Sequence, residues 1–131
     1  MKKREKIIVW IDENWDIMDR TMEPLRKDGF DVFTFYSGGE AFEEKDLLRR
    51  ACLIIVDPFG IDENNLCDFE LLEKILMDEE IKAFVVIFTS PAHFYTHSKD
   101  RFKNYGVKDI IIKAIFPTRF KQRIEEILDT Y

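Results

Sequence analysis

Polar side chains of three kinds follow four of the five apolar runs in this sequence. Asp12 and Glu13 come after the first run, Asp57 after the third, Thr89 after the fourth, and Lys113 at the end of the fifth. If the runs are parallel strands, their carboxyl ends open on the same edge of the sheet. We therefore expect these five side chains to converge at one edge.

This set of side chains is suited to phosphoryl transfer. Three carboxylates at one edge repel one another unless a cation neutralises them, and Mg²⁺ is commonly held by one or two carboxylates together with phosphate oxygens and waters. Lys113 adds a charge that can pair with Asp57 at rest and with a phosphoryl oxygen afterwards. Thr89 supplies a hydroxyl donor. We interpret Asp57 as a nucleophile suited to forming an aspartyl phosphate.

Each of these residues also has an ordinary explanation when it is taken alone. Asp12 or Asp57 could cap the helix that follows its strand, and Lys113 could be a solvated surface charge. Capping does not require all of these residues to lie on one edge of a sheet. Their coincidence there favours a site.

The five apolar runs alternate with helical stretches, which is typical of βαβ units and a parallel sheet. The runs are 6–11, 31–36, 52–56, 83–88 and 107–112. The first, third and fourth are continuously apolar, as central strands buried on both faces should be. We predict an α/β fold: a three-layer, doubly wound arrangement around a five-stranded parallel sheet in the flavodoxin-like order 2-1-3-4-5.

Helices are expected in the connections and after the last strand. Apolar side chains at offsets of three and four line one side of the first and last helical stretches: Trp15, Met18, Met22 and Leu25, then Phe120, Ile124, Ile127 and Leu128. Ser37 and Glu40 form a capping box that starts a short helix. Gly29 suits the end of the first helix, and Pro117 suits the first turn of the last. Pro24 should bend or shorten the first helix.

Length and composition fit one globular domain, 1–131. The chain has 131 residues, of which 46% are hydrophobic, and a formal net charge of −6. An acidic chain is poorly suited to contacting nucleic acid directly, because phosphates favour clustered Lys and Arg. The first apolar stretch, Ile7 to Ile11, is too short for a secretory signal or a membrane span. We expect a cytoplasmic protein with no membrane segment.

Five stretches together carry a resemblance that covers nearly the whole chain. They are IIVWIDEN at 7–14, GFDVFTFYSGGEAF at 29–42, LIIVDP at 53–58, VVIFTS at 85–90 and GVKDIIIK at 106–113. In this combination the sequence resembles the receiver domains of two-component response regulators, the CheY-like proteins. The resemblance implies that Asp57 is the phosphoacceptor, Thr89 the switch hydroxyl and Lys113 the amine that contacts the phosphoryl group. It also implies a set of Mg²⁺ ligands: Asp12, Glu13, Asp57 and the backbone carbonyl of Phe59.

The resemblance implies a signalling switch rather than an enzyme, with at most self-phosphorylation and self-dephosphorylation. A sensor histidine kinase, a phosphotransfer protein or a small phosphodonor would then deliver the phosphoryl group to Asp57. Phosphorylation would change a surface that binds a downstream protein partner. A homodimer through the helix after strand four, the fifth strand and the last helix is a further option.

Several positions depart from the family pattern. The acidic pair is Asp-Glu where Asp-Asp or Glu-Asp is usual, and another register would place Ile11 and Asp12 there. Ile110 occupies the aromatic switch position of the fifth strand, and Ala114 follows Lys113 where the family usually has a cis proline. Ile110, Ala114 and an unusual loop after Asp57 favour an alternative, a pseudo-receiver that acts as a phosphorylation-independent protein-interaction module, whereas the retained Asp57, Thr89, Lys113 and acidic pair argue against it.

Two other classes of function fit the sequence less well. A nucleotide- or flavin-binding protein of similar fold would need a Gly-rich phosphate cradle after the first strand, and acidic residues stand there instead. An independent hydrolase would need a serine or cysteine paired with a histidine, and the sequence gives no sign of such a pair.

Overall fold

The five predicted strands form one parallel sheet. The computed structural model describes residues 5–12, 15–58, 67–91 and 106–130. Its strands are β1 (Ile7–Ile11), β2 (Asp31–Phe35), β3 (Leu53–Val56), β4 (Phe84–Thr89) and β5 (Asp109–Ile112). Every strand pair is parallel, and the order is β2-β1-β3-β4-β5. This confirms the predicted α/β fold and the strand order 2-1-3-4-5.

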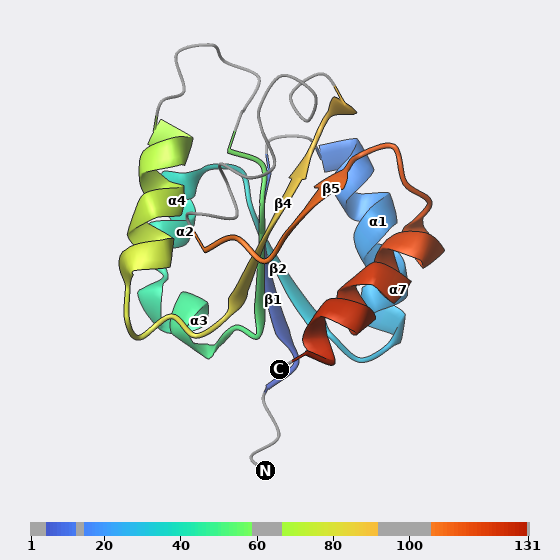
Figure 1. Ribbon diagram of the computed structural model, residues 1–131, viewed down its shortest axis with the longest axis horizontal. Helices are drawn as coiled ribbons and strands as arrows, with labels where there is room; N and C mark the ends of the chain where they lie inside the picture. Colours follow the sequence, from blue (N-terminus) through green and yellow to red (C-terminus); the bar gives the residue numbers. More distant parts are fainter. Residues whose placement is uncertain (1–4, 13–14, 59–66, 92–105, 131) are drawn as a thin grey trace.

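Helices cover both faces of the sheet (Figure 1). They are α1 (Trp15–Lys27), α2 (Gly38–Glu43), α3 (Lys45–Arg50), α4 (Cys67–Met77) and α7 (Pro117–Leu128). The first and last lie together on one face, and the other three lie on the opposite face. The helix predicted between β4 and β5 falls mostly in 92–105, outside the described residues.

The alternation of side chains along β1 explains why its apolar run is continuous. Ile7, Val9 and Ile11 belong to the core beneath α2, α3 and α4. Ile8 and Trp10 belong to the core beneath α1 and α7. All five side chains are buried, because a central strand has a helical layer on each side.

An aromatic group joins the sheet to α7 just below its carboxyl edge. The Trp10 ring stacks on Phe120 with their centroids 5.3 Å apart, and Phe88 lies 4.8 Å from Phe120. Each ring is fully buried. Trp10 and Phe88 precede the site positions of β1 and β4 by two residues and one residue, so this packing fixes the strand ends that carry the site.

Pro24 was expected to bend or shorten the first helix, and the structure shows that it does not shorten it. The helix runs from Trp15 to Lys27 with Pro24 inside it. The last turn is held by Leu25, which is fully buried against the sheet. Burial of a leucine contributes a stabilisation comparable to the cost of the lost backbone hydrogen bond. The chain then turns at Gly29, whose φ of 91° is the left-handed conformation predicted there.

The second connection contains two short helices. Ser37 caps α2, because its hydroxyl accepts a hydrogen bond from the backbone N–H of Glu40. That helix ends at Glu43. Glu44 follows with a φ of −103° and a ψ of 54°, which are not helical, and α3 begins directly afterwards. The start of the capped helix was predicted, whereas the break at Glu44 was not. Pro117 lies in the first turn of α7, as expected.

Candidate functional site

Four site residues are positioned by the backbone hydrogen bonds between neighbouring parallel strands. Asp12 N–H donates to the Phe35 carbonyl at 2.9 Å, Asp57 N–H to Ile11 at 3.1 Å, and Lys113 N–H to Thr89 at 2.7 Å. These bonds continue the strand pairing one residue beyond β1, β3 and β5. The site therefore stands on rigid backbone at the carboxyl edge of the sheet, where ligand sites of open α/β sheets form.

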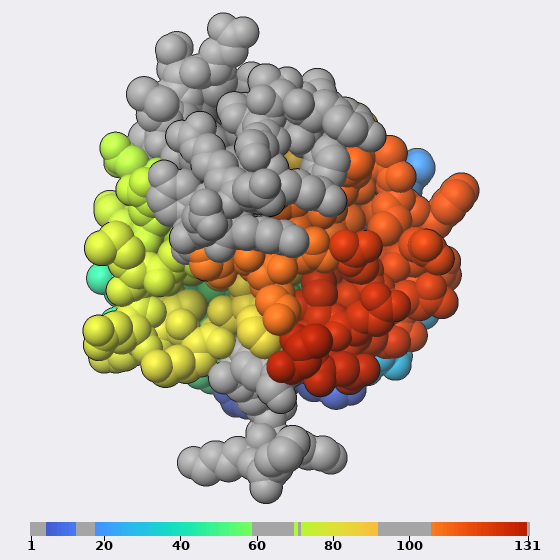
Figure 2. Space-filling model, in the orientation of Figure 1, coloured from blue at the N-terminus to red at the C-terminus, as the bar shows by residue number. Residues whose placement is uncertain are grey.

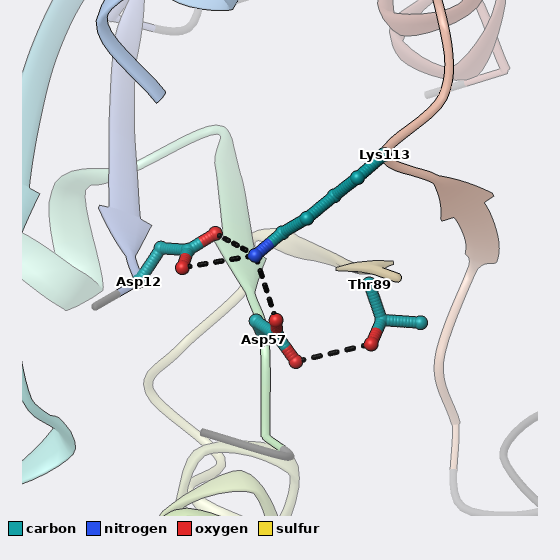
Figure 3. A network of polar contacts seen from close by, with 4 residues as sticks. All are labelled: Asp12, Asp57, Thr89 and Lys113. Carbon is teal, nitrogen blue, oxygen red and sulfur yellow. Dashed lines mark hydrogen bonds and ion pairs between the residues drawn. The ribbon is translucent and has the colours of Figure 1, made fainter. Parts of the chain in front are cut away.

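Lys113 connects two of the predicted carboxylates, as Figure 3 shows. Its Nζ lies 2.8 Å from Asp57 Oδ2, and 2.9 and 3.1 Å from the two carboxylate oxygens of Asp12. The side chains are only 8%, 11% and 3% exposed for Lys113, Asp57 and Asp12 respectively. One ammonium thus neutralises two carboxylates that are almost removed from water.

Thr89 holds the other oxygen of Asp57. Its Oγ1 donates to Asp57 Oδ1 at 3.2 Å, and the residue is fully buried. The Asp57 carboxylate therefore lies between a hydroxyl on one oxygen and an ammonium on the other (Figure 3). The carboxylate is the nucleophilic form of the acid, and both of its oxygens are thus held in place.

The charge state of Lys113 reflects the balance between burial and its partners. Burial lowers the pKa of its amine, but the negative charges of Asp12 and Asp57 and the hydrogen bonds to them outweigh burial. The net result is a pKa above its ordinary value of 10.5. Lys113 is therefore a fixed positive charge at neutral pH.

The donor set suits a small divalent cation. Carboxylate oxygens of Asp12 and Asp57 already converge on one positive charge, the Lys113 ammonium, and carboxylates are ligands that Mg²⁺ prefers. Within the described residues, no three His, Cys, Asp or Glu side chains are grouped as metal ligands. The predicted ligands Glu13 and the Phe59 carbonyl lie outside the described residues, so their roles stay predictions.

The structure thus brings together four of the predicted site residues, and it adds a pairing that sequence reasoning missed, between Lys113 and Asp12. Lys113 was expected to pair with Asp57, but its two contacts with Asp12 were not anticipated. The sequence offered no signal for them, because the choice between carboxylates depends on where the lysine side chain points.

The switch position of β5 is apolar and buried. Ile110 is 6% exposed and packs in the core beneath α2, α3 and α4. Ala114, directly after Lys113, is exposed. Residue 110 of β5 is therefore an isoleucine in the core, where an aromatic ring would be needed for rotation between a buried and an exposed position.

Comparisons with known proteins identify the fold. No protein-family model matches the sequence, and no curated protein sequence matches it either. Solved structures do match. The receiver domain of NtrX from Brucella abortus is 22% identical with a TM-score of 0.78, and the match covers 95% of this chain and 99% of that one. The chemotaxis response regulator CheY4 of Vibrio cholerae is 18% identical with a TM-score of 0.75, and the match covers 95% of this chain and 99% of that one.

A response regulator from Thermotoga maritima gives a similar result, with 25% identity, a TM-score of 0.72 and coverage of 95% of this chain and 98% of that one. Against the longer NtrX chain of the crystal structure with ADP, the match covers 95% of this chain but only 26% of NtrX. The structural neighbours are receiver domains and response regulators, and this chain has the CheY-like receiver fold.

Proposed function

We propose that this chain is a two-component receiver that accepts a phosphoryl group on Asp57. The observation that carries the proposal is the environment of this carboxylate. Asp57 follows β3 at the functional edge of the sheet, with Lys113 Nζ at 2.8 Å and Thr89 Oγ1 at 3.2 Å. A carboxylate positioned between a cation and a hydroxyl donor is suited to nucleophilic attack on phosphorus.

The reaction would form one bond and break one bond at phosphorus. A carboxylate oxygen of Asp57 attacks, and the bond to the donor's leaving group breaks, which is a histidine nitrogen in a phosphorylated kinase or an acyl oxygen in acetyl phosphate. The phosphoryl oxygens then accept hydrogen bonds from the Lys113 ammonium and the Thr89 hydroxyl. Both side chains already point at Asp57 (Figure 3), so little rearrangement is needed.

Asp12 would hold Mg²⁺ together with Asp57, and the Glu13 carboxylate and the Phe59 carbonyl are the further ligands that we propose. When bound, the ion would neutralise negative charge on the carboxylates and the phosphoryl oxygens. The protein's own contribution is to keep two nearly buried carboxylates close together. At 3% and 11% exposure, their side chains are little screened by water.

The same proposal covers partners and location. A sensor histidine kinase, a phosphotransfer protein or a small phosphodonor would supply the phosphoryl group, and a downstream protein would read the changed surface in the cytoplasm. Apart from self-phosphorylation and self-dephosphorylation, no catalytic activity is proposed. Among the described residues, no helix has the length and apolar character needed to cross a membrane.

A second candidate, the phosphorylation-independent interaction module, is favoured by two observations. The Lys113 ammonium pairs with both carboxylates, and the buried Ile110 stands in β5 where a switch ring would be expected. Because the Asp57 carboxylate already has a cationic partner, phosphorylation would change the contacts of Lys113 less. The first candidate is preferred, because an interaction module does not need a carboxylate, a lysine and a hydroxyl to converge.

Phosphorylation of the intact chain separates the two candidates. We expect incubation with acetyl phosphate and Mg²⁺ to add one phosphoryl group, which intact-mass spectrometry detects, and EDTA to prevent it. Asp57→Asn should abolish the addition. Asp129→Asn is the matched control, because Asp129 is an exposed acid at the end of α7, and this variant should react like the wild type.

Absence of a Mg²⁺-dependent adduct, or an adduct that persists in Asp57→Asn, would reject the phosphoacceptor and favour the interaction module. Amide spectra recorded with beryllium fluoride provide a second measurement that does not depend on the lifetime of the acyl phosphate. Shifts centred on Asp57, Thr89 and Lys113 are expected.

A further inference from the structure

Among the described residues, no strand lies beyond the outer edge of β2, which stands first in the order β2-β1-β3-β4-β5. The pairing with β1 uses the Asp31 N–H and the Phe35 carbonyl. Since backbone groups alternate in direction along a strand, those of Val32 and Thr34 point toward the outer edge. In Figure 2, β5 and α7 (orange and red) form much of the face turned toward the viewer. The β2 edge lies at the other end of the strand order and is a separate surface.

A contact from α1 confirms which way these backbone groups point. The Arg26 Nη2 donates to the Val32 carbonyl at 3.4 Å, which is long for a hydrogen bond and therefore weak. Within the described part of the chain, no hydrogen bond from a neighbouring strand engages the outward N–H and carbonyl of Thr34. The middle of this edge is thus open to another strand.

The edge is also apolar and lacks the usual protection against strand pairing. Proteins commonly protect an edge strand with lysine, proline or a bulge. The stretch VFTFY at 32–36 contains neither a charged residue nor a proline. Phe33 is 42% exposed and Tyr36 is 47% exposed, so large apolar side chains flank the open backbone groups. Pairing with a further strand would cover both.

We propose that β2 pairs in antiparallel fashion with β2 of a second copy of this chain, about a two-fold axis at Thr34. In this register the two Thr34 residues exchange their outward N–H and carbonyl groups as hydrogen bonds. Val32 lies opposite Tyr36 of the second copy, and Phe33 lies opposite its Phe35. The two five-stranded sheets then continue into each other, and each contact occurs twice because the interface is two-fold.

The sequence of β2 identifies the second copy as the occupant, because the strand is complementary to itself in this register. The facing pairs are threonine with threonine, phenylalanine with phenylalanine and valine with tyrosine. Pairs of these three kinds stabilise antiparallel strands. Asp31 falls opposite Ser37, so no two like charges face each other. An unrelated strand would have to match this pattern, whereas a second copy always carries it.

This inference does not depend on the proposed function. Strand pairing at β2 requires no phosphoryl group on Asp57, so the two proposals can fail separately. We expect Asp57→Asn to dimerise like the wild type even though it cannot be phosphorylated.

Opposite charges at position 34 test the register, because Thr34 faces itself only in this arrangement. Sedimentation velocity over a dilution series at low ionic strength should show a monomer–dimer equilibrium for the wild type. Thr34 is partly exposed, so the single chain can accommodate a charge there. Thr34→Lys and Thr34→Glu should each raise the dimer dissociation constant at least about fivefold, because like charges then stand opposite each other. An equimolar mixture of the two variants should dimerise again, because a lysine then faces a glutamate.

The control variant is Thr118→Lys, which makes the same substitution at an exposed position of α7 and should sediment like the wild type. Thr34→Pro is a second test that introduces no charge. It removes the N–H that points to the outer edge and spares the pairing with β1, so it should also weaken the dimer. Circular dichroism checks that each variant is folded.

Three results would overturn the proposal. A wild type that stays monomeric throughout the series leaves the β2 edge to an extended segment of another protein. A mixture of Thr34→Lys and Thr34→Glu that dimerises no better than either variant alone excludes the register. A Thr34→Pro dimer as tight as that of the wild type excludes pairing through this edge.

Discussion

Replacement of Lys113 by methionine isolates the electrostatic role of this lysine. Lys113→Met keeps much of the side-chain volume but leaves Asp12 and Asp57 as two carboxylates that are 3% and 11% exposed. Removing one partner from a buried ion pair costs about 3 to 5 kcal/mol. The two acids can share a proton, which relieves part of this cost, so we expect a loss of about 3 kcal/mol in the free energy of unfolding without metal.

Urea denaturation at neutral pH in EDTA measures this loss. With a slope of about 2 kcal/mol per molar urea, the unfolding midpoint should fall by about 1.5 M. Fluorescence can follow unfolding, since Trp10 is fully buried in the native state. Lys27→Met is the matched control, because the Lys27 side chain is 76% exposed, and this variant should change stability by less than about 0.5 kcal/mol.

Two further conditions sharpen the test. Mg²⁺ should recover part of the lost stability in Lys113→Met, since a bound cation stabilises the folded state. Mild acid should also reduce the difference in unfolding free energy between Lys113→Met and the wild type, because protonation of one carboxylate removes the repulsion between Asp12 and Asp57. The reasoning is refuted if Lys113→Met unfolds at the wild-type urea midpoint in EDTA. It is also refuted if neither Mg²⁺ nor acid reduces the loss in unfolding free energy of this variant relative to the wild type.

Three other perturbations have defined outcomes. Thr89→Val removes the 3.2 Å hydrogen bond to Asp57 and should cost about 1 to 2 kcal/mol of stability by urea denaturation; an unchanged midpoint would contradict a structural role for this bond. Arg50→Ala should raise the pKa of Glu5, which its hydrogen bond to Arg50 lowers, and carboxyl NMR titration would show no shift if that bond is absent in solution. Gly29→Ala should lower the free energy of unfolding by about 1 kcal/mol, detected as a lower melting temperature, because φ is 91° at this residue; equal stability would mean that the turn readjusts.

The sequence by itself determined the sheet and the edge that carries the site. Continuous apolar runs marked β1, β3 and β4 as central strands, and the strand order is the predicted one. Strand ends then placed Asp12, Asp57, Thr89 and Lys113 on one edge. These inferences succeeded because side-chain periodicity and chain direction are local properties, and parallel strands bring all their carboxyl ends to the same side.

Local signals were weaker where packing opposed them. Pro24 alone predicts a bent or shortened helix, yet the helix continues to Lys27 because Leu25 is buried against the sheet. The break at Glu44 between α2 and α3 was also not foreseen. A proline or a capping residue changes the free energy of a helix by a few kcal/mol at most. Burial of a neighbouring side chain can outweigh that change.

Only the tertiary structure decided which groups touch. Lys113 lies 101 residues from Asp12 in the chain, and the sequence predicted its pairing with Asp57 but not its contact with Asp12. The register of β1, β3 and β5 and the direction of one flexible side chain together place the ammonium between both carboxylates. Such a contact depends on distances across three strands, which residue types and spacing do not encode.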